Sequence, residues 1–98
     1  SNESRNKIMH VYFSLLLKYI SDYNFDIEIK KIEENEIRSI SAHLSSGIIV
    51  KFGSKDIKSK IHTFLKVYKT LNSSDLKKIG YIDMRYSNGF SIGWKGVK

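Results

Sequence analysis

The fold of this chain depends most on the stretch Ile79-Gly-Tyr-Ile-Asp-Met-Arg-Tyr-Ser-Asn-Gly-Phe-Ser-Ile-Gly-Trp-Lys95. Residues 81–86 and residues 90–94 alternate apolar with polar or small side chains, which is the pattern of half-buried β-strands. Asn88-Gly89 lies between the two runs, and these residue types reach the positive φ values of a two-residue type I′ turn at low cost. The stretch therefore predicts a β-hairpin in which the turn sets the register of both strands.

The second strand of this hairpin is expected to be an edge of its sheet. It runs into Lys95, and the sequence ends at Lys98, so no later strand in it covers the outer side. An open edge presents unpaired backbone groups and accepts a strand from another chain. On the first strand, Ile82 and Met84 are expected to face the core.

Five other hairpin side chains are candidates for structural or functional roles. Asp83 and Arg85 share a strand face, where they neutralise each other or flank a solvated surface, unless Arg85 instead projects to a carboxylate of a partner. Tyr86 and Phe90 flank the turn and are expected to pair across the hairpin. Trp94 is either a core plug at the rim of the sheet or an interface anchor, and the sequence leaves both open.

The sequence before the hairpin predicts two helices and three strands. In chain order they are a helix from about Ser4 to Asp22, strands around Phe25–Ile29, Glu36–Leu44 and Ile48–Phe52, and a helix that follows Gly53. Ser54 is expected to cap the second helix, and Asn72-Ser73-Ser74 to end it. The first helix is so apolar that we expect it to be well covered.

Together these elements predict an α+β domain. Its two helices pack on a mainly antiparallel sheet of about five strands, which ends in the C-terminal β-hairpin with its open edge strand. The second helix is long enough to be a crossover, so the hairpin need not lie beside its neighbours in sequence. Residues 1–98 are expected to form a single domain.

Charge and composition narrow the classes of function. The chain contains no cysteine, which excludes disulfides and thiol catalysis. A net charge of +7 raises nucleic acid or an anionic membrane as a partner. Only Arg5, Arg38 and Arg85 are arginines, however, and the lysines are spread along the whole sequence. A general compositional bias toward lysine explains this pattern better than a nucleic-acid site does.

Catalytic and metal-binding patterns find little support. His10, His43 and His62 lie on different expected elements without metal-ligand spacing. The carboxylates of residues 33–36 fall in an expected polar turn, where solvated charge is the usual state. No Gly-x-Ser-x-Gly motif occurs. We therefore expect no catalytic residue, no metal and no cofactor.

The hairpin and the sequence before it resemble the C-terminal part of a known family. Residues Tyr81–Tyr86, Gly89-Phe90 and Gly93-Trp94 resemble the ending of the bacterial divisome protein FtsQ, also called DivIB. The likeness extends upstream through residues 45–53 and through the helix that carries Lys60, and it covers roughly residues 40 to 95. Lys60 stands where that family has an arginine, which keeps the charge but loses the planar fork that binds carboxylates bidentately.

This resemblance implies a function. FtsQ-like proteins are non-enzymatic, single-pass inner-membrane proteins whose extracytoplasmic C-terminal domain binds the partners FtsB and FtsL, with a partner strand added to its last strand. The membrane helix and the small domain that precede this region in the family are not in the present sequence. The corresponding interface residues here are Arg85, Tyr86, Ser87, Asn88, Gly89, Phe90, Ile92, Trp94 and Lys60.

Two other classes of function stay open from the sequence alone. The first is a basic α+β module that binds nucleic acid, which steeply salt-dependent binding to arbitrary oligonucleotides would reveal. The second is a small enzyme with an unrecognised site, for which a ligand-sized pocket with convergent polar groups would be the sign.

Overall fold

A computed structural model describes the backbone of residues 2–96 and the side chains of residues 6–96. Its elements are α1 (Asn2–Asp22), β1 (Ile29–Glu34), β2 (Ile40–Leu44), β3 (Ile49–Gly53), α2 (Ile57–Thr70), α3 (Ser73–Lys78), β4 (Ile79–Asp83) and β5 (Ser91–Trp94). The predicted α+β class is confirmed, with a third, short helix, α3, that was not expected.

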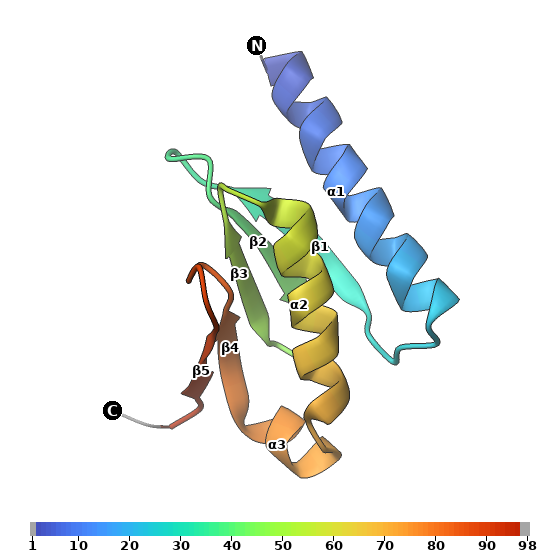
Figure 1. Ribbon diagram of the computed structural model, residues 1–98, viewed down its shortest axis with the longest axis vertical. Helices are drawn as coiled ribbons and strands as arrows, with labels where there is room; N and C mark the ends of the chain where they lie inside the picture. The colour runs from blue at the N-terminus through green and yellow to red at the C-terminus, as the bar shows by residue number, and fades with distance from the viewer. Residues whose placement is uncertain (1, 97–98) are drawn as a thin grey trace.

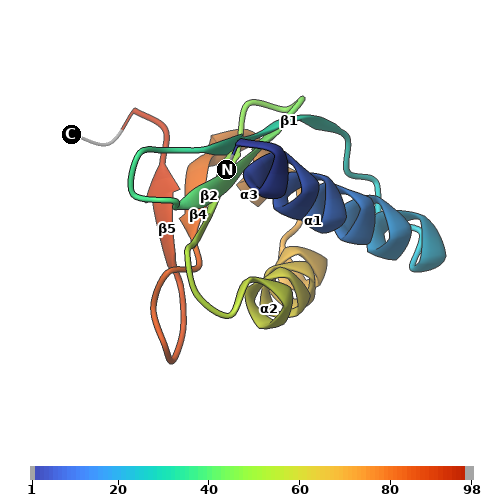
Figure 2. The same ribbon diagram turned by 90° about the horizontal axis from the view of Figure 1, so that it is seen from above.

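The five strands form one sheet in the order β1-β2-β3-β4-β5. All neighbouring pairs are antiparallel except β3 and β4, which are parallel. The segment α2–α3 is therefore a crossover connection, and it returns the chain to the strand beside β3 (Figure 1). Both long helices lie over the same face of the sheet (Figure 2). The last strand, β5, lies at an edge of the sheet, as predicted.

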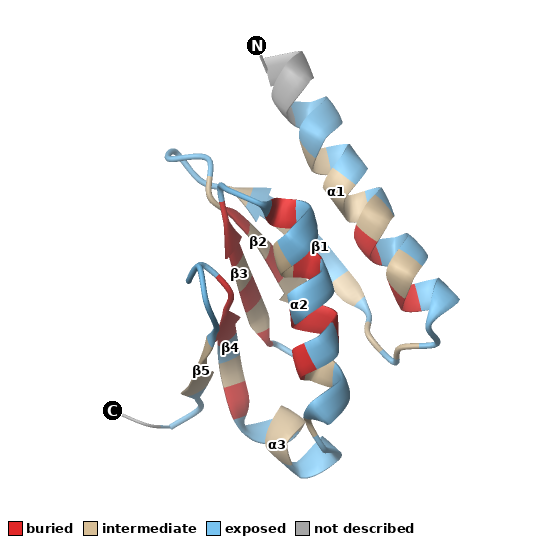
Figure 3. Ribbon diagram, viewed as in Figure 1, coloured by how far each residue is buried: buried red, intermediate tan, exposed pale blue. Residues whose placement is uncertain are grey.

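The core lies between that face of the sheet and the two helices. Figure 3 shows the buried residues along β2, β3 and β4 and along the sheet-facing side of α2. Phe64 of α2 meets Phe52 of β3 edge to face, with ring centroids 5.9 Å apart. Ile82 and Met84 are almost completely buried, which confirms their predicted orientation. Each such side chain contributes roughly 1.5–3 kcal/mol of hydrophobic stabilisation.

The first helix is less well covered than predicted. Leu16 and Ile20 are buried against the core, whereas Ile8 and Val11 are 49% and 60% exposed. Figure 1 gives the reason, because the first half of α1 projects beyond the strands. The expectation of a well-covered helix is therefore wrong for that half.

The first strand begins where it was expected to end. β1 starts at Ile29, and residues 25–28 form an irregular link from α1. The turn that follows comes later than predicted, because the Asn35 side chain organises it. Asn35 Oδ1 accepts hydrogen bonds from the backbone N–H groups of Ile37, at 3.0 Å, and Ser39, at 2.9 Å. This Asx-type turn leaves the carboxylates of residues 33 and 34 on the strand and delays β2 to Ile40.

Both predicted ends of the second helix differ from the structure. α2 begins after Asp56, whose φ of 52° is left-handed, so Ser54 does not cap it. Asn72 does not end α2 but starts α3. Its side chain accepts a hydrogen bond from Asp75 N at 2.8 Å, while Asp75 Oδ2 accepts one from Asn72 N at 3.4 Å. The sequence carries this reciprocal capping pattern, Asn-x-x-Asp, and it indicates a helix start.

Candidate functional site

The outer edge of β5 is the first component of the candidate site. β4 and β5 are antiparallel, with Ile82 opposite Ile92 and Tyr81 opposite Gly93. Within residues 2–96 no further strand pairs with β5, so one side of its backbone is available. The strand carries no charged side chain, whereas the opposite edge, β1, has the sequence IKKIEE. Charged side chains protect an edge from strand addition, and β5 lacks that protection.

The connection between β4 and β5 is a loop, residues 84–90, and not the predicted two-residue turn. Gly89 has a positive φ of 143°, but Asn88 does not have the positive φ that a type I′ turn requires. The cause lies at Asp83. Its Oδ1 accepts a hydrogen bond from the backbone N–H of Arg85 at 3.0 Å, and this local bond turns the chain away from the sheet after Met84, whose own N–H still donates to the Lys51 carbonyl oxygen at 2.8 Å.

Asp83 and Arg85 form a bidentate ion pair at the base of this loop. Arg85 Nε donates to Asp83 Oδ1 at 2.8 Å, and the guanidinium NH2 group donates to Oδ2 at 2.7 Å. The side chain of Asp83 is 6% exposed and that of Arg85 is 51% exposed. The two residues therefore neutralise each other, which is one of the alternatives that the sequence left open. These hydrogen bonds lower the pKa of Asp83 below its usual value and raise the pKa of Arg85 above its usual value.

This ion pair makes stability depend on pH. A carboxyl group whose pKa is lower in the folded than in the unfolded protein stabilises the fold above its unfolded pKa, about 3.9 for aspartate. That stabilisation is lost as the pH falls through the folded pKa of Asp83. Asp83→Asn is expected to melt at a lower temperature than the natural chain above about pH 5, and the difference should shrink below about pH 4. Thermal melts of both proteins across this range test it, and a gap that stays constant in acid would contradict it.

Four aromatic side chains of the hairpin are exposed, namely Tyr81, at 38%, and the three predicted interface residues. Tyr86, Phe90 and Trp94 are 55%, 44% and 42% exposed. Trp94 therefore does not plug the core, and Ile92 is the β5 residue that packs against it. Tyr86 and Phe90 form no ring pair in the described part of the chain, so their predicted contact across the hairpin is wrong. The three predicted interface rings are free to contact a partner along the edge.

The helix α2 brings Lys60 to the loop. Gly53, which has a φ of 85°, lies beneath both basic side chains. A Cβ atom at Gly53 would lie 3.2 Å from Arg85 Cγ and 3.7 Å from Lys60 Nζ. Lys60 and Arg85 thus converge from different elements. No ion pair in the described part of the chain involves Lys60.

Lys60 and Arg85 line an open cleft between α2 and the loop, with a volume of about 360 Å³. We call it the loop cleft, and its lining residues are Lys55, Asp56, Ser59, Lys60, Thr63, Met84, Arg85, Tyr86, Ser87 and Gly89. Of the predicted site residues, five therefore share this cleft. Phe90, Ile92 and Trp94 lie along the neighbouring edge, and Asn88 is exposed in the loop. Sequence reasoning missed the burial of Asp83, which orients Arg85.

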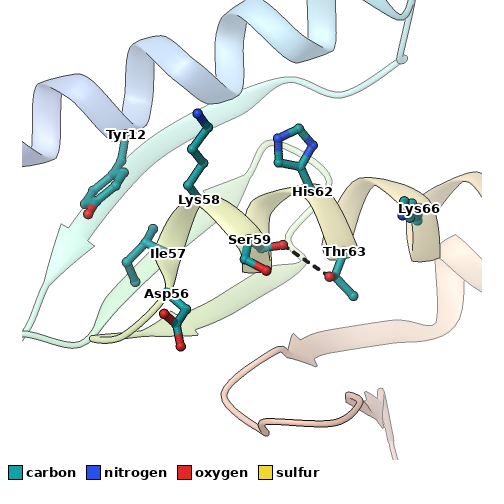
Figure 4. A pocket seen from close by; sticks show the side chains of 8 residues that line it. All are labelled: Tyr12, Asp56, Ile57, Lys58, Ser59, His62, Thr63 and Lys66. Carbon is teal, nitrogen blue, oxygen red and sulfur yellow. Dashed lines mark hydrogen bonds between the residues drawn. The ribbon is translucent and has the colours of Figure 1, made fainter.

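A second open pocket lies between α1 and α2 (Figure 4). His62 projects into it from α2, and its ring packs on that of Tyr19 with centroids 4.5 Å apart. The dashed line in Figure 4 marks the hydrogen bond from Thr63 Oγ1 to the backbone oxygen of Ser59, at 3.1 Å. No hydrogen bond of the described residues joins His62 to a carboxylate or hydroxyl group. These polar groups do not form a nucleophile–base arrangement.

Metal sites and membrane spans are absent from the described part of the chain. Its histidine and acidic side chains form no cluster of three that would hold a metal ion. None of its helices combines the length and apolar character needed to cross a membrane.

Residues 2–85 match the family described as "Cell division protein FtsQ/DivIB, C-terminal". The chain is 33% identical to the cell division protein FtsQ of Haemophilus influenzae over 76% of its own length and 30% of that protein. It is 30% identical to the cell division protein FtsQ of Vibrio cholerae over 81% of its length and 32% of that protein. The chain thus spans about a third of the curated relatives it matches.

One relative carries a different name. A low-affinity inorganic phosphate transporter of Buchnera aphidicola is 34% identical over 98% of this chain, but the match covers only 20% of that protein. Because only this small part of the transporter is matched, its phosphate transport activity is not assigned to this chain. The match to the cell division family model ends at Arg85, before β5.

Proposed function

This chain belongs to the FtsQ/DivIB C-terminal family of cell division proteins, and on that premise we propose that it binds FtsB- and FtsL-like partners by accepting a strand on β5. The observation that carries the proposal is the uncharged edge of β5, which is flanked by exposed Trp94 and Phe90. Backbone groups of the edge supply hydrogen bonds to an added strand. Side chains beside it select the partner.

The loop cleft supports this choice of partner surface. Lys60 places a positive charge with no ion-pair partner among the described residues beside the guanidinium of Arg85, close to the start of β5 where an added strand would begin or end. Arg85 is already oriented by Asp83, so little side-chain freedom is lost when a partner carboxylate binds it. We therefore propose that the partner places acidic residues in the loop cleft and apolar residues beside β5.

The role of the whole protein extends this proposal. We propose a non-enzymatic scaffold of the divisome, anchored in the inner membrane by a single helix outside the present sequence, with this domain on the extracytoplasmic side. The support is the membership of the chain in the family, of whose relatives it spans about a third of the length. The described residues themselves support only the part of this proposal that concerns partner binding at β5.

Amide hydrogen exchange tests the proposed strand addition. The purified chain is mixed with the soluble segment of the FtsB-type protein from the same genome. We expect the β5 amides to become protected, while those of β1, the other edge, keep their exchange rates. Protection of β1 or of α2 alone would overturn the proposal. Binding of arbitrary oligonucleotides with steep salt dependence would support the nucleic-acid function instead.

A further inference from the structure

We propose that Tyr81 and Gly93 are positioning residues that hold β5 in the register needed for its partner, an inference that rests on the proposed function. They lie directly opposite each other in the β4–β5 pair. The next residue of β4, Ile82, is buried in the core, so strand alternation places Tyr81 on the opposite face, which the helices do not cover (Figure 2). Neither residue lines the loop cleft, and Tyr81, which is 38% exposed, is not among the interface residues predicted from the sequence.

The ring of Tyr81 occupies the space above Gly93. A Cβ atom at Gly93 would lie 1.9 Å from Tyr81 Cε2, 2.3 Å from Cζ and 2.4 Å from Cδ2. No real contact is that short, so any side chain at Gly93 would displace the ring. The constraint at Gly93 is spatial, because its φ is not in the positive range that favours glycine.

The same ring is also in contact with Lys51 of β3. Lys51 Nζ lies 4.3 Å from the Tyr81 ring centroid, in a cation–π contact. Residues from three adjacent strands are thus stacked in a row across the outer face. Glycine weakens a strand because it has no side chain to pack, and an aromatic ring laid over it from the neighbouring strand restores that packing.

Register matters here because β5 is short and its pairing is irregular. The strand has four residues, and its register with β4 shifts between Ile79 and Tyr81. A slip by one residue would move Ile92 from the core face to the outer face. The row formed by Lys51, Tyr81 and Gly93 opposes such a slip, since the ring fits only beside a glycine.

A double-mutant cycle tests the inference. The variants are Gly93→Ala, Tyr81→Ala and the double replacement, with Tyr81→Phe as the variant that keeps the ring. Gly80→Ala is the matched control, because a Cβ atom there would meet its nearest neighbour, the Gly93 carbonyl oxygen, at an ordinary 3.4 Å. Each variant is measured by β5 amide exchange without a partner, by affinity for the FtsB-type segment and by thermal melting.

We expect Gly93→Ala to speed β5 exchange and to weaken binding by about tenfold, with a much smaller change in melting temperature than a core substitution causes. When Gly93→Ala is added to Tyr81→Ala, it should weaken binding by less than about twofold further, because the ring that it would displace is already absent. Tyr81→Phe and Gly80→Ala should behave like the natural chain. Independent, additive effects of the two single variants, or unchanged exchange in Gly93→Ala, would overturn the inference.

The exchange measurement separates this inference from the proposed function. If the natural chain does not bind the segment, strand addition fails as a function. Coupled effects of Tyr81 and Gly93 on β5 exchange would then still support their positioning of the strand, and additive effects would still refute it.

Discussion

Trp94→Ala is expected to abolish binding of the FtsB-type segment and to leave the domain folded. Trp94 is 42% exposed and takes no part in the buried core, so its removal opens no cavity. An aromatic anchor at an interface contributes about 2 kcal/mol or more, which corresponds to a loss of affinity of roughly thirtyfold. Tyr86→Ala, at a side chain that is 55% exposed, is expected to act in the same way.

A pull-down with the segment and a thermal melt of each variant measure the two effects. Tyr23 offers a matched control, because it is an aromatic residue that is 63% exposed just after α1, away from β5. Tyr23→Ala should keep both binding and melting temperature. If Trp94→Ala and Tyr86→Ala unfold the domain, these residues are structural, and if the folded variants bind normally, the proposed interface is wrong.

Arg85→Glu is expected to weaken both stability and binding, whereas Lys60→Glu weakens binding alone. Arg85 is the only hydrogen-bonding side-chain partner of the buried Asp83 carboxylate among the described residues, and a glutamate there places two negative charges side by side. Because Arg85 is half exposed, solvent screens part of this cost, and we expect a loss of about 1–3 kcal/mol. Lys60 has no such partner, so its reversal leaves the fold intact.

Denaturant melts and binding at two salt concentrations separate these effects. The binding defect of Lys60→Glu should shrink as salt rises, since the interaction with an acidic partner is screened within about 10 Å at 0.1 M salt. Lys69, on α2 away from the loop cleft, provides a control, and Lys69→Glu should bind normally. Equal losses in Lys60→Glu and Lys69→Glu would point to net charge and not to the cleft.

The sequence predicted most of the secondary structure near the hairpin because alternation is a local signal that the sheet respects. Ile82 and Met84 were placed in the core on that signal, and the structure buries both. The turn was misjudged because Asn88-Gly89 favours a tight hairpin locally, whereas the Asp83 side chain binds the backbone N–H of Arg85, two residues after the end of the strand. A side chain that competes for the backbone overrides turn propensity.

The candidate residues could be named from the sequence, whereas their geometry could not. The resemblance to FtsQ supplied Lys60 and Arg85, and only the fold shows that they meet over Gly53. The burial of Asp83 was not predictable, because a carboxylate stays buried only where a partner is supplied, and alternation alone does not show which partner is in reach. The need for glycine at position 93 was likewise hidden, since it depends on a ring from another strand.

The crossover between β3 and β4 has a consequence for the order of folding. The parallel pair forms only after residues 54–78 have been brought back across the sheet, and closing such a long connection is entropically costly until α2 is packed. β5 is attached to the sheet only through β4. The edge strand β5 is therefore expected to form last, after most of the apolar surface of the chain is already buried. This order limits strand pairing between incompletely folded copies.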